Sequence, residues 1–154
     1  MTETSVSKSQ HPFTPARPYR AEVLVRFGDC DPAGIVFYPR YLEIFNNIVE
    51  DWCREGLQLS FPDLITQRGW GLPTVHLDVD FTAPSRFGEL LSATLTVRSV
   101  GASSVRVELA LCGPDGGLRV RGSVVLVLID RKPHKAIPIP DDLRARMLAF
   151  RAGD

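Results

Sequence analysis

The 154-residue sequence has few of the residues that build metal centres or disulfide frameworks. It contains three cysteines and three histidines, and no two of these six residues stand at the short spacing of a metal-binding pair. We therefore expect no metal site and no disulfide framework. Three widely spaced thiols are typical of a reducing cytoplasm, where we expect the protein to be located.

An excess of charge of one sign is also lacking, because 18 basic and 18 acidic side chains balance. This balance argues against nucleic acid or a membrane surface as a partner, and it leaves self-association unopposed by net charge. No apolar run approaches the ~20 residues of a membrane-spanning helix. Residues 1–18 are rich in Ser, Thr and Pro and lack the apolar core of a signal peptide. We predict a flexible tail over residues 1–18 and one domain over residues 19–154.

Several catalytic signatures are missing as well. The sequence has no Gly-x-Ser-x-Gly motif, no phosphate-binding Walker loop and no dinucleotide-binding glycine fingerprint. These absences exclude an α/β-hydrolase triad and the common nucleotide-binding folds. The chemistry has to come from another arrangement of side chains.

The hydrophobic pattern predicts one long helix and five main strands. Pro39–Glu55 carries a broad apolar stripe at three- and four-residue steps, starts with a proline and is followed by Gly56. Alternating segments predict strands over residues 19–27, 73–83, 89–100, 103–112 and 118–130, of which the last is expected to be central and buried on both faces. Less regular segments predict a short helix at 61–67, a flexible turn at 69–71 and a terminal helix at 141–150. The economical packing is an α+β fold in which an antiparallel sheet of about five strands wraps around the helix.

One loop places acidic residues between the first strand and the long helix. Asp29 and Asp31 follow the strand, and Pro39 opens the helix a few residues later. A helix N-terminus offers free N–H groups and partial positive charge, so a carboxylate there can act as base or nucleophile beside an oxyanion site. The spacing alone favours Asp31 as an ordinary turn residue. We interpret Asp29 as shaping the loop and Cys30 as a packed residue, since two adjacent acids raise a thiol pKa.

Residues 28–41, with the sequence GDCDPAGIVFYPRY, resemble the signature of the 4-hydroxybenzoyl-CoA thioesterase family of hot-dog proteins. The layout of strand, helix and strands extends the resemblance over residues 19–140. It implies a hot-dog fold that hydrolyses an acyl-CoA thioester, an aryl-CoA such as 4-hydroxybenzoyl-CoA or a short or medium acyl-CoA, to the free acid and CoA. It implies no cofactor, and it implies a homodimer or homotetramer with sites at the interface.

The resemblance also implies roles for individual residues. Asp31 matches the family's catalytic acid, Tyr38 matches the position whose backbone N–H binds the oxyanion, and Gly71 matches a second site segment more loosely. Whether Asp31 attacks the carbonyl or activates a water is left open.

Further residues are candidates for binding the substrate. Phe37 and Trp70 suit an acyl group, although Trp70 is equally well explained as an anchor for its loop, and His76 is expected at a subunit interface. The remaining candidates would contact CoA and are Arg98, Ser103, Ser104, Arg131 and Lys132. The loop that carries basic residues in the family has Gly-Ala-Ser-Ser here, at positions 101–104.

Two other functions stay open. One is a hot-dog dehydratase or hydratase, which usually needs a histidine beside the acid, and this loop has none. The other is a non-catalytic acyl-CoA-binding module, against which an intact Asp31 argues.

Overall fold

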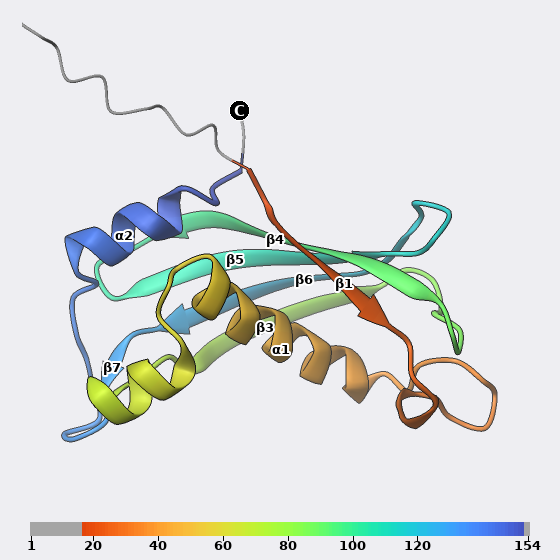
Figure 1. The fold of residues 1–154 in the computed structure, drawn as a ribbon, viewed down its shortest axis with the longest axis horizontal. Coiled ribbons are helices and arrows are strands. Elements are labelled where there is room, and N and C mark those ends of the chain that lie inside the picture. The colour runs from red at the N-terminus through yellow and green to blue at the C-terminus, as the bar shows by residue number, and fades with distance from the viewer. Residues whose placement is uncertain (1–16, 153–154) are drawn as a thin grey trace, which may run out of the picture.

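A computed structural model describes residues 17–152 of the chain (Figure 1). The predicted tail, residues 1–18, lies outside the described residues except for Arg17 and Pro18. A five-stranded sheet has the order β1-β4-β5-β6-β3, and each neighbouring pair is antiparallel. Its strands are β1 (Tyr19–Leu24), β3 (Thr74–Phe81), β4 (Leu90–Val100), β5 (Ser104–Cys112) and β6 (Leu118–Val127). The strands β4, β5 and β6 follow one another in the chain and pair as an antiparallel meander.

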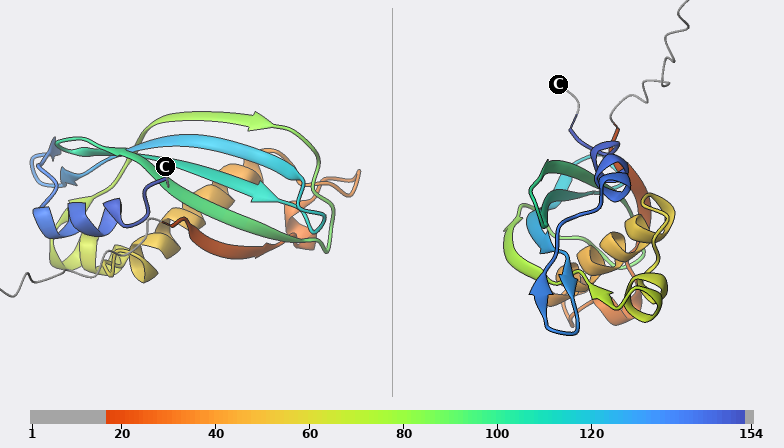
Figure 2. Two further views of the ribbon diagram at one scale, coloured as in Figure 1. Left: turned by 90° about the horizontal axis from the view of Figure 1, so that it is seen from above. Right: turned by 90° about the vertical axis from the view of Figure 1, so that its left-hand side faces the viewer.

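The long helix α1 (Pro39–Glu55) has the predicted limits and runs along the concave face of the curled sheet (Figure 2). Its apolar stripe is buried against the sheet, and the buried residues are Tyr41, Ile44, Phe45, Ile48, Val49, Trp52 and Cys53. A close approach is at Gly122 of β6, where a Cβ atom would lie 2.5 Å from Cε2 of Phe45. The two layers thus share one core, as the sequence predicts for an α+β fold.

The first strand is shorter than predicted, and Phe27 does not belong to it. β1 ends at Leu24, and Phe27–Asp29 forms a 3₁₀ turn in which the Phe27 side chain is 82% exposed. The turn forms because the Asp29 carboxylate accepts a hydrogen bond from the Arg26 N–H at 2.9 Å. This local bond overrides the strand alternation, and it redirects the chain into the loop that contains Asp31.

A second, small sheet was not predicted. β2 (Trp70–Gly71) pairs with β7 (Ile129–Asp130), which pairs in turn with β8 (Lys135–Ala136). The prediction of a flexible turn at residues 69–71 is therefore wrong, since two of the three residues are held in a strand. Residues 63–67 form a single π-helical turn, and the terminal helix α2 (Asp141–Leu148) ends two residues earlier than predicted.

The strand β6 is paired on both sides but is not the centre of the sheet, which is β5. Only one of its faces is buried, and the other is exposed or half-buried, as Arg121 and Val125 show. The prediction of burial on both faces is wrong because the side chains of the outer face have no second layer above them in the described chain.

The strand β3 is one of the two edge strands of the sheet, and β1 is the other. From His76 onward it alternates, since Leu77 lies opposite Val124 on the helix side and His76 lies opposite Val125 on the outer side, whereas a register shift interrupts the pairing at Val75. Apolar side chains stay exposed along this edge: Val75 is 59%, Leu77 41% and Phe81 51% exposed. An open edge with exposed apolar residues is a typical site of association with another chain.

Candidate active site

The loop that carries Asp31 is a tight hairpin closed by its own backbone. Cys30 and Val36 form a bridge, the Asp31 N–H donates to the carbonyl of Ile35 at 2.9 Å, and the Gly34 N–H donates to the carbonyl of Asp31 at 2.9 Å. Gly34 has φ +81°, a conformation that strains other residues. The Asp31 Oδ1 atom accepts the Ala33 N–H at 2.9 Å, whereas Oδ2 has no hydrogen-bond partner within residues 17–152. One carboxylate oxygen is thus fixed and the other is available.

The surroundings of Asp29 and Cys30, the two residues before Asp31, favour structural roles for both. Asp29 accepts the Arg26 N–H through its side chain and the Phe37 N–H through its carbonyl, each at 2.9 Å. These bonds support the interpretation that Asp29 shapes the loop. Burial, followed by the carboxylates of Asp29 and Asp31, raises the pKa of the Cys30 thiol. A protonated thiol is a poor nucleophile, so the structure favours Asp31 as the reactive group of this loop.

The N-terminus of α1 presents one unpaired backbone donor. Tyr38 is the N-cap residue, and in the described part of the chain its N–H has no hydrogen-bond partner. Pro39 has no N–H, and the Arg40 N–H donates to the carbonyl of Phe37 at 2.9 Å. The Tyr38 ring packs edge-on against Phe81 at 6.1 Å between ring centroids. Tyr38 therefore supplies an available N–H at the positive end of the helix dipole, as predicted.

Asp31 opens onto a shallow cavity of about 450 Å³. Its lining residues are Phe27, Cys30, Asp31, Pro32, Gly34 and Phe87. Phe27 and Phe87 pack edge to face with their ring centroids 5.9 Å apart. Two exposed aromatic rings and one carboxylate thus share a cavity that a flat, apolar group would fit.

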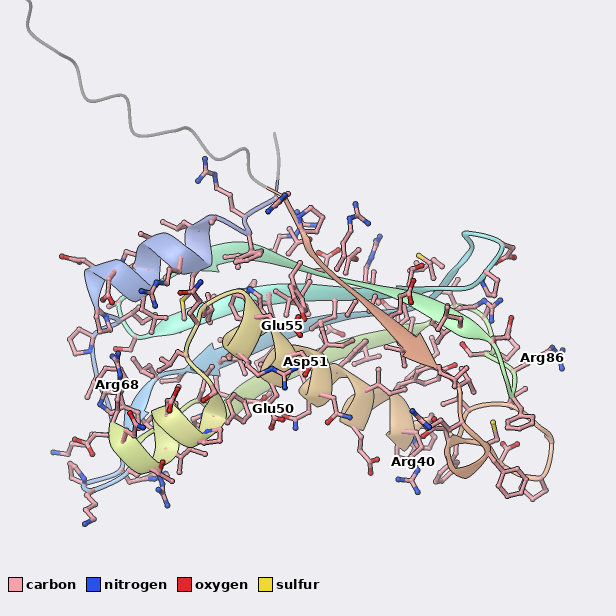
Figure 3. All side chains as sticks on the ribbon, viewed as in Figure 1. Arg40, Glu50, Asp51, Glu55, Arg68 and Arg86 are labelled. Atoms are coloured by element: carbon pink, nitrogen blue, oxygen red, sulfur yellow. The ribbon has the colours of Figure 1, made fainter. Side chains whose placement is uncertain are left out.

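The sequence pattern does not identify Phe27, Phe87 or Arg86 as site residues. Phe27 continues the alternation of the first predicted strand. Phe87 and Arg86 lie in a connection between strands, where no periodic pattern identifies them. Arg86 projects outward at the Asp31 end of the molecule, as does Arg40 (Figure 3). Arg40 is paired with Glu43 at 2.8 Å, whereas Arg86 has no ion-pair partner among the described residues.

Several other candidates lie at the opposite end of the molecule, where β7 is labelled in Figure 1. Trp70 and Gly71 pair with β7, the Arg131 N–H donates to the carbonyl of Gly69, and the carbonyl of Ser103 accepts the Leu128 N–H. Ser104 opens β5 beside Ser103, and Lys132 follows in the exposed connection after β7. The 17 residues of α1, about 25 Å in length, separate these residues from Asp31. One chain alone does not bring the predicted site residues together.

The remaining candidates lie outside both groups. Phe37 is exposed next to Tyr38, and its ring contacts the Tyr38 ring at 5.5 Å between centroids. His76 is exposed on the outer face of β3. Arg98 on β4 forms an ion pair with Glu108 at 2.8 Å, so its guanidinium is already engaged. Of the predicted substrate-binding residues, only Phe37 lies close to the N-terminus of α1.

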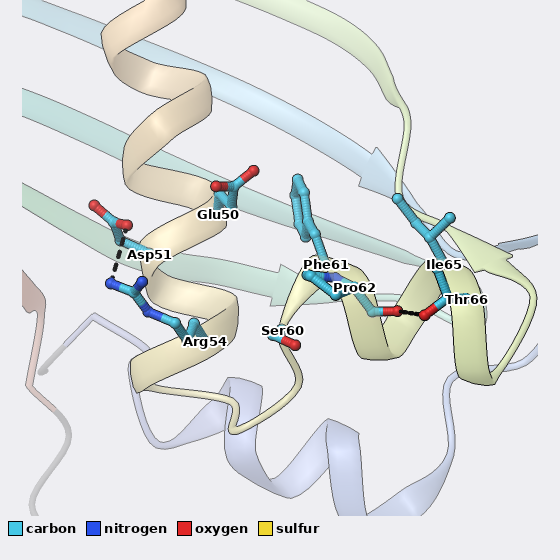
Figure 4. Close-up of a pocket in the computed structure, with 8 residues that line it drawn as sticks. All are labelled: Glu50, Asp51, Arg54, Ser60, Phe61, Pro62, Ile65 and Thr66. Atoms are coloured by element: carbon cyan, nitrogen blue, oxygen red, sulfur yellow. Dashed lines mark hydrogen bonds and ion pairs between the residues drawn. The ribbon is translucent and has the colours of Figure 1, made fainter.

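Another cavity, of about 550 Å³, lies elsewhere on the described chain (Figure 4). It is at the C-terminal half of α1, and it is lined by Glu50, Asp51, Arg54, Ser60, Phe61, Pro62, Ile65 and Thr66. Its acids have a cationic neighbour, since Arg54 pairs with Asp51 at 3.5 Å. Neither Asp31 nor Tyr38 lines it, so we take the smaller cavity at Asp31 as the candidate site.

An ion pair holds the segment on which the Asp31 loop rests. The Arg119 guanidinium donates to both carboxylate oxygens of Glu89, at 2.9 and 3.0 Å, and both side chains are mostly buried. The bonds from Arg119 and from the Arg86 N–H lower the pKa of Glu89 from its usual 4.5 to about 2. The pair is bidentate, the geometry that makes an ion pair between a guanidinium and a carboxylate strong.

The lowered pKa of Glu89 predicts a pH dependence of stability. Because the unfolded chain binds the proton first, the stabilisation by Glu89 is present above about pH 4.5 and is lost as the pH falls towards 2. The difference in free energy of unfolding between wild type and Glu89→Gln should therefore shrink on acidification, as urea denaturation at pH 7, 4.5 and 3 would show. Glu22→Gln, at an exposed position of β1, is the matched control. A wild-type advantage that stays constant down to pH 3 would contradict the assignment.

Within residues 17–152, no three His, Cys, Asp or Glu side chains are grouped so as to hold a metal ion. The three cysteines are free thiols. No described helix has the length and apolar character needed to cross a membrane.

Comparisons with known proteins agree with this fold. A 1,4-dihydroxy-2-naphthoyl-CoA hydrolase from Synechocystis is 27% identical over 117 residues, which are 75% of this chain and 84% of that protein. The crystal structure of a 1,4-dihydroxy-2-naphthoyl-CoA thioesterase from Synechocystis matches with a TM-score of 0.77 at 25% identity, over 84% of this chain and 95% of the other. A gentisyl-coenzyme A thioesterase matches with a TM-score of 0.74 at 26% identity, over 82% and 99% of the two chains.

These relatives confirm the predicted hot-dog fold and the predicted enzyme class, acyl-CoA thioesterase. Their names specify dihydroxynaphthoyl and gentisyl groups, so the narrower assignment to 4-hydroxybenzoyl-CoA thioesterases is not confirmed. The family model that matches residues 25–147 is that of the thioesterase-like superfamily. This match covers the Asp31 loop, α1 and all strands of the main sheet after β1, and the chain belongs to the thioesterase-like superfamily.

Proposed function

We propose that the protein hydrolyses an aryl-CoA thioester, with Asp31 as the reactive carboxylate and the Tyr38 N–H as the oxyanion donor. The observation that carries this proposal is that two unsatisfied groups lie in the segment that leads into α1, one in the hairpin at residues 30–36 and one at the N-cap of the helix. The Asp31 Oδ2 atom and the Tyr38 N–H both lack partners within residues 17–152, while the groups around them are hydrogen-bonded. A carboxylate and an oxyanion donor are the two elements that acyl transfer from a thioester needs.

The chemistry follows from these two groups. A thioester carbonyl at the helix N-terminus is polarised by the Tyr38 N–H, and one good donor stabilises the developing oxyanion by about 3–4 kcal/mol. Asp31 then either attacks the carbonyl carbon, which expels CoA as the thiolate and leaves an anhydride for water to hydrolyse, or takes a proton from a water that attacks directly. Both routes give the free acid and CoA.

The aromatic character of the cavity supports an aryl substrate. Phe27 and Phe87 form one side of the cavity that Asp31 lines, and both rings are exposed. Stacking and edge contacts with such rings favour a flat aromatic acyl group over a flexible chain. The relatives named as dihydroxynaphthoyl-CoA and gentisyl-CoA thioesterases have aromatic acyl substrates, which makes these two esters the first to test.

In this proposal, a second copy of the chain completes the site. β3 begins three residues after Gly71 and ends at Phe81, whose ring contacts the Tyr38 ring. If the open edges of two β3 strands pair antiparallel about a two-fold axis, the start of one strand lies beside the end of the other. The partner subunit's Gly71 then approaches the Tyr38 end of the first chain, and the two separated groups of candidates form one site.

A panel of acyl-CoA esters with a thiol-detecting reagent tests the proposed function. We expect the fastest release of CoA from the dihydroxynaphthoyl or gentisyl ester, with slower release from short straight-chain esters. Release from none of them would overturn the proposal. Hydration of an enoyl-CoA would favour the hydratase alternative, and tight binding without turnover would favour the binding module.

A further inference from the structure

The ion pair between Arg119 and Glu89 lies behind the Asp31 loop rather than in its cavity. Arg119 is on β6, its side chain is 11% exposed, and Glu89 lies just before β4. The Arg119 Nη1 atom also donates to the carbonyl of Pro84 at 2.9 Å, and Glu89 accepts the Arg86 N–H. The pair therefore fixes both ends of the connection between β3 and β4 at residues 84–89.

This connection is the surface on which the Asp31 loop rests. The Val36 N–H donates to the carbonyl of Ser85 at 2.9 Å, and the Phe87 N–H donates to the carbonyl of Gly34 at 3.2 Å. On the other side, Val25 exchanges two backbone bonds with Gly88 and Glu89, at 2.9 and 2.8 Å. Both sides of the Asp31 loop are thus attached to residues 84–89, and Phe87 also contributes a wall of the cavity.

We propose that Arg119 and Glu89 are positioning residues, which act through the 84–89 connection to hold the Asp31 carboxylate at the distance from the Tyr38 N–H that catalysis needs. This inference rests on the proposed function, since it concerns the geometry of the same two groups. Arg119 and Glu89 line neither of the two cavities described above, and neither is a candidate to touch the substrate.

The surroundings of Arg119 indicate that its position is closely defined. A Cβ atom at Gly113 would lie 2.2 Å from the Arg119 Nη2 atom, so the guanidinium occupies the space that a side chain at residue 113 would fill. Asp115 adds a second, longer ion pair at 3.7 Å. Ser85, in the middle of the clamped connection, is fully buried. The charge contacts and the packing thus hold residues 84–89 in one conformation.

A small shift at this position is expected to affect the reaction strongly. A displacement of about 1 Å between reacting groups can cost about 10²-fold in rate. Removing one partner of a mostly buried ion pair leaves the other charge unpaired, which drives the local structure to rearrange. The expected signature is a fall in kcat that is larger than any rise in KM, because the clamp acts on the reacting groups, whereas Phe87 is the one residue of this connection that lines the cavity.

The test compares Arg119→Met, Arg119→Lys and Glu89→Gln under conditions where circular dichroism shows each variant fully folded. We expect kcat for the best aryl-CoA ester to fall about 10- to 100-fold in Arg119→Met, with KM within about threefold of wild type. Arg119→Lys keeps the charge but loses the bidentate contact, so its kcat should lie between those of Arg119→Met and wild type. The amide hydrogens of Val36 and Phe87 should exchange faster in Arg119→Met.

Arg146→Met is the matched control, since Arg146 also holds a loop, through a 2.9 Å bond to the carbonyl of Leu57, at the opposite end of the molecule. Its kcat should stay within about twofold of wild type. A folded Arg119→Met variant with wild-type kcat, or with kcat and stability lowered to the same extent as in Arg146→Met, would overturn the inference. Asp31→Asn in the same assay separates the two proposals: if it is as fast as wild type, the proposed function fails, whereas if it is slow and Arg119→Met is fast, only the positioning role fails.

Discussion

Asp31→Asn is expected to lower kcat for an aryl-CoA ester by about 10³-fold while leaving the fold intact. The amide oxygen of asparagine can still accept the Ala33 N–H that now bonds to Oδ1, so the loop keeps its conformation. The amide group, however, is neither a nucleophile nor a base. The residual rate would come from the Tyr38 N–H and from substrate binding. Steady-state kinetics with a thiol-detecting reagent, together with a thermal unfolding curve, measures both effects.

Asp29→Asn is the matched control for this prediction. Asp29 is two residues away and also uses one oxygen to accept a backbone N–H, that of Arg26. An asparagine can make the same bond, so kcat should fall less than about tenfold if Asp29 only shapes the loop. Equal losses in the two variants would mean that the loop conformation, and not the Asp31 carboxylate, determines the rate. An Asp31→Asn variant within threefold of wild type would exclude Asp31 as the reactive group.

The sequence predicts those parts of the fold that follow from periodicity. The apolar stripe of α1, with proline at its start and glycine after its end, gives both limits of the helix because these signals are local. The alternation in β3 likewise gives the correct faces, with Leu77 inward and His76 outward. Asp31 and Tyr38 are candidates because residues 28–41 resemble the family signature, and neither periodicity nor spacing alone identifies them.

The sequence pattern does not predict features that depend on one specific contact. Phe27 continues the alternation of β1, but the hydrogen bond from the Arg26 N–H to the Asp29 carboxylate turns the chain at this point. Trp70 and Gly71 form a strand because β7 lies beside them, more than fifty residues later in the chain. Phe87 reaches the cavity because backbone bonds attach its connection to the Asp31 loop. In the last two cases the decisive contact joins segments that lie far apart in the sequence.

Under the proposed function, the separation of the candidate residues along α1 gives the open edge of β3 a part in the reaction. The Thr82 N–H donates to the carbonyl of Arg119 on β6, and hydrogen bonds alternate along an antiparallel ladder. The backbone groups of Leu77, Val79 and Phe81 therefore point towards the open edge. A second copy that pairs there would satisfy these groups, cover the exposed apolar side chains and bring the partner subunit's Gly71 to the Tyr38 end. Assembly and activity should consequently be lost together.

Leu77→Lys tests this coupling. The Leu77 side chain is 41% exposed in the single chain, and pairing of two edges would bury it, so a lysine here places an unpaired charge in the interface. We expect self-association to weaken about 10²-fold or more. Light scattering should then give a mass near the 17.1 kDa of one chain at concentrations where wild type is a dimer or tetramer. The specific activity should be low when the variant is dilute and should rise with its concentration.

The concentration dependence distinguishes loss of assembly from loss of folding, because a misfolded variant stays inactive at any concentration. Ile65→Lys is the matched control: Ile65 is a similarly exposed apolar residue, 37% exposed, but it lies on the π-helical turn away from the open edge. This variant should keep the wild-type mass and rate. A monomeric Leu77→Lys variant with full activity would show that one chain contains the whole site. In that case Gly71 and the residues near β7 would have no part in the reaction, and Asp31, Tyr38 and the cavity formed with Phe27 and Phe87 would have to suffice.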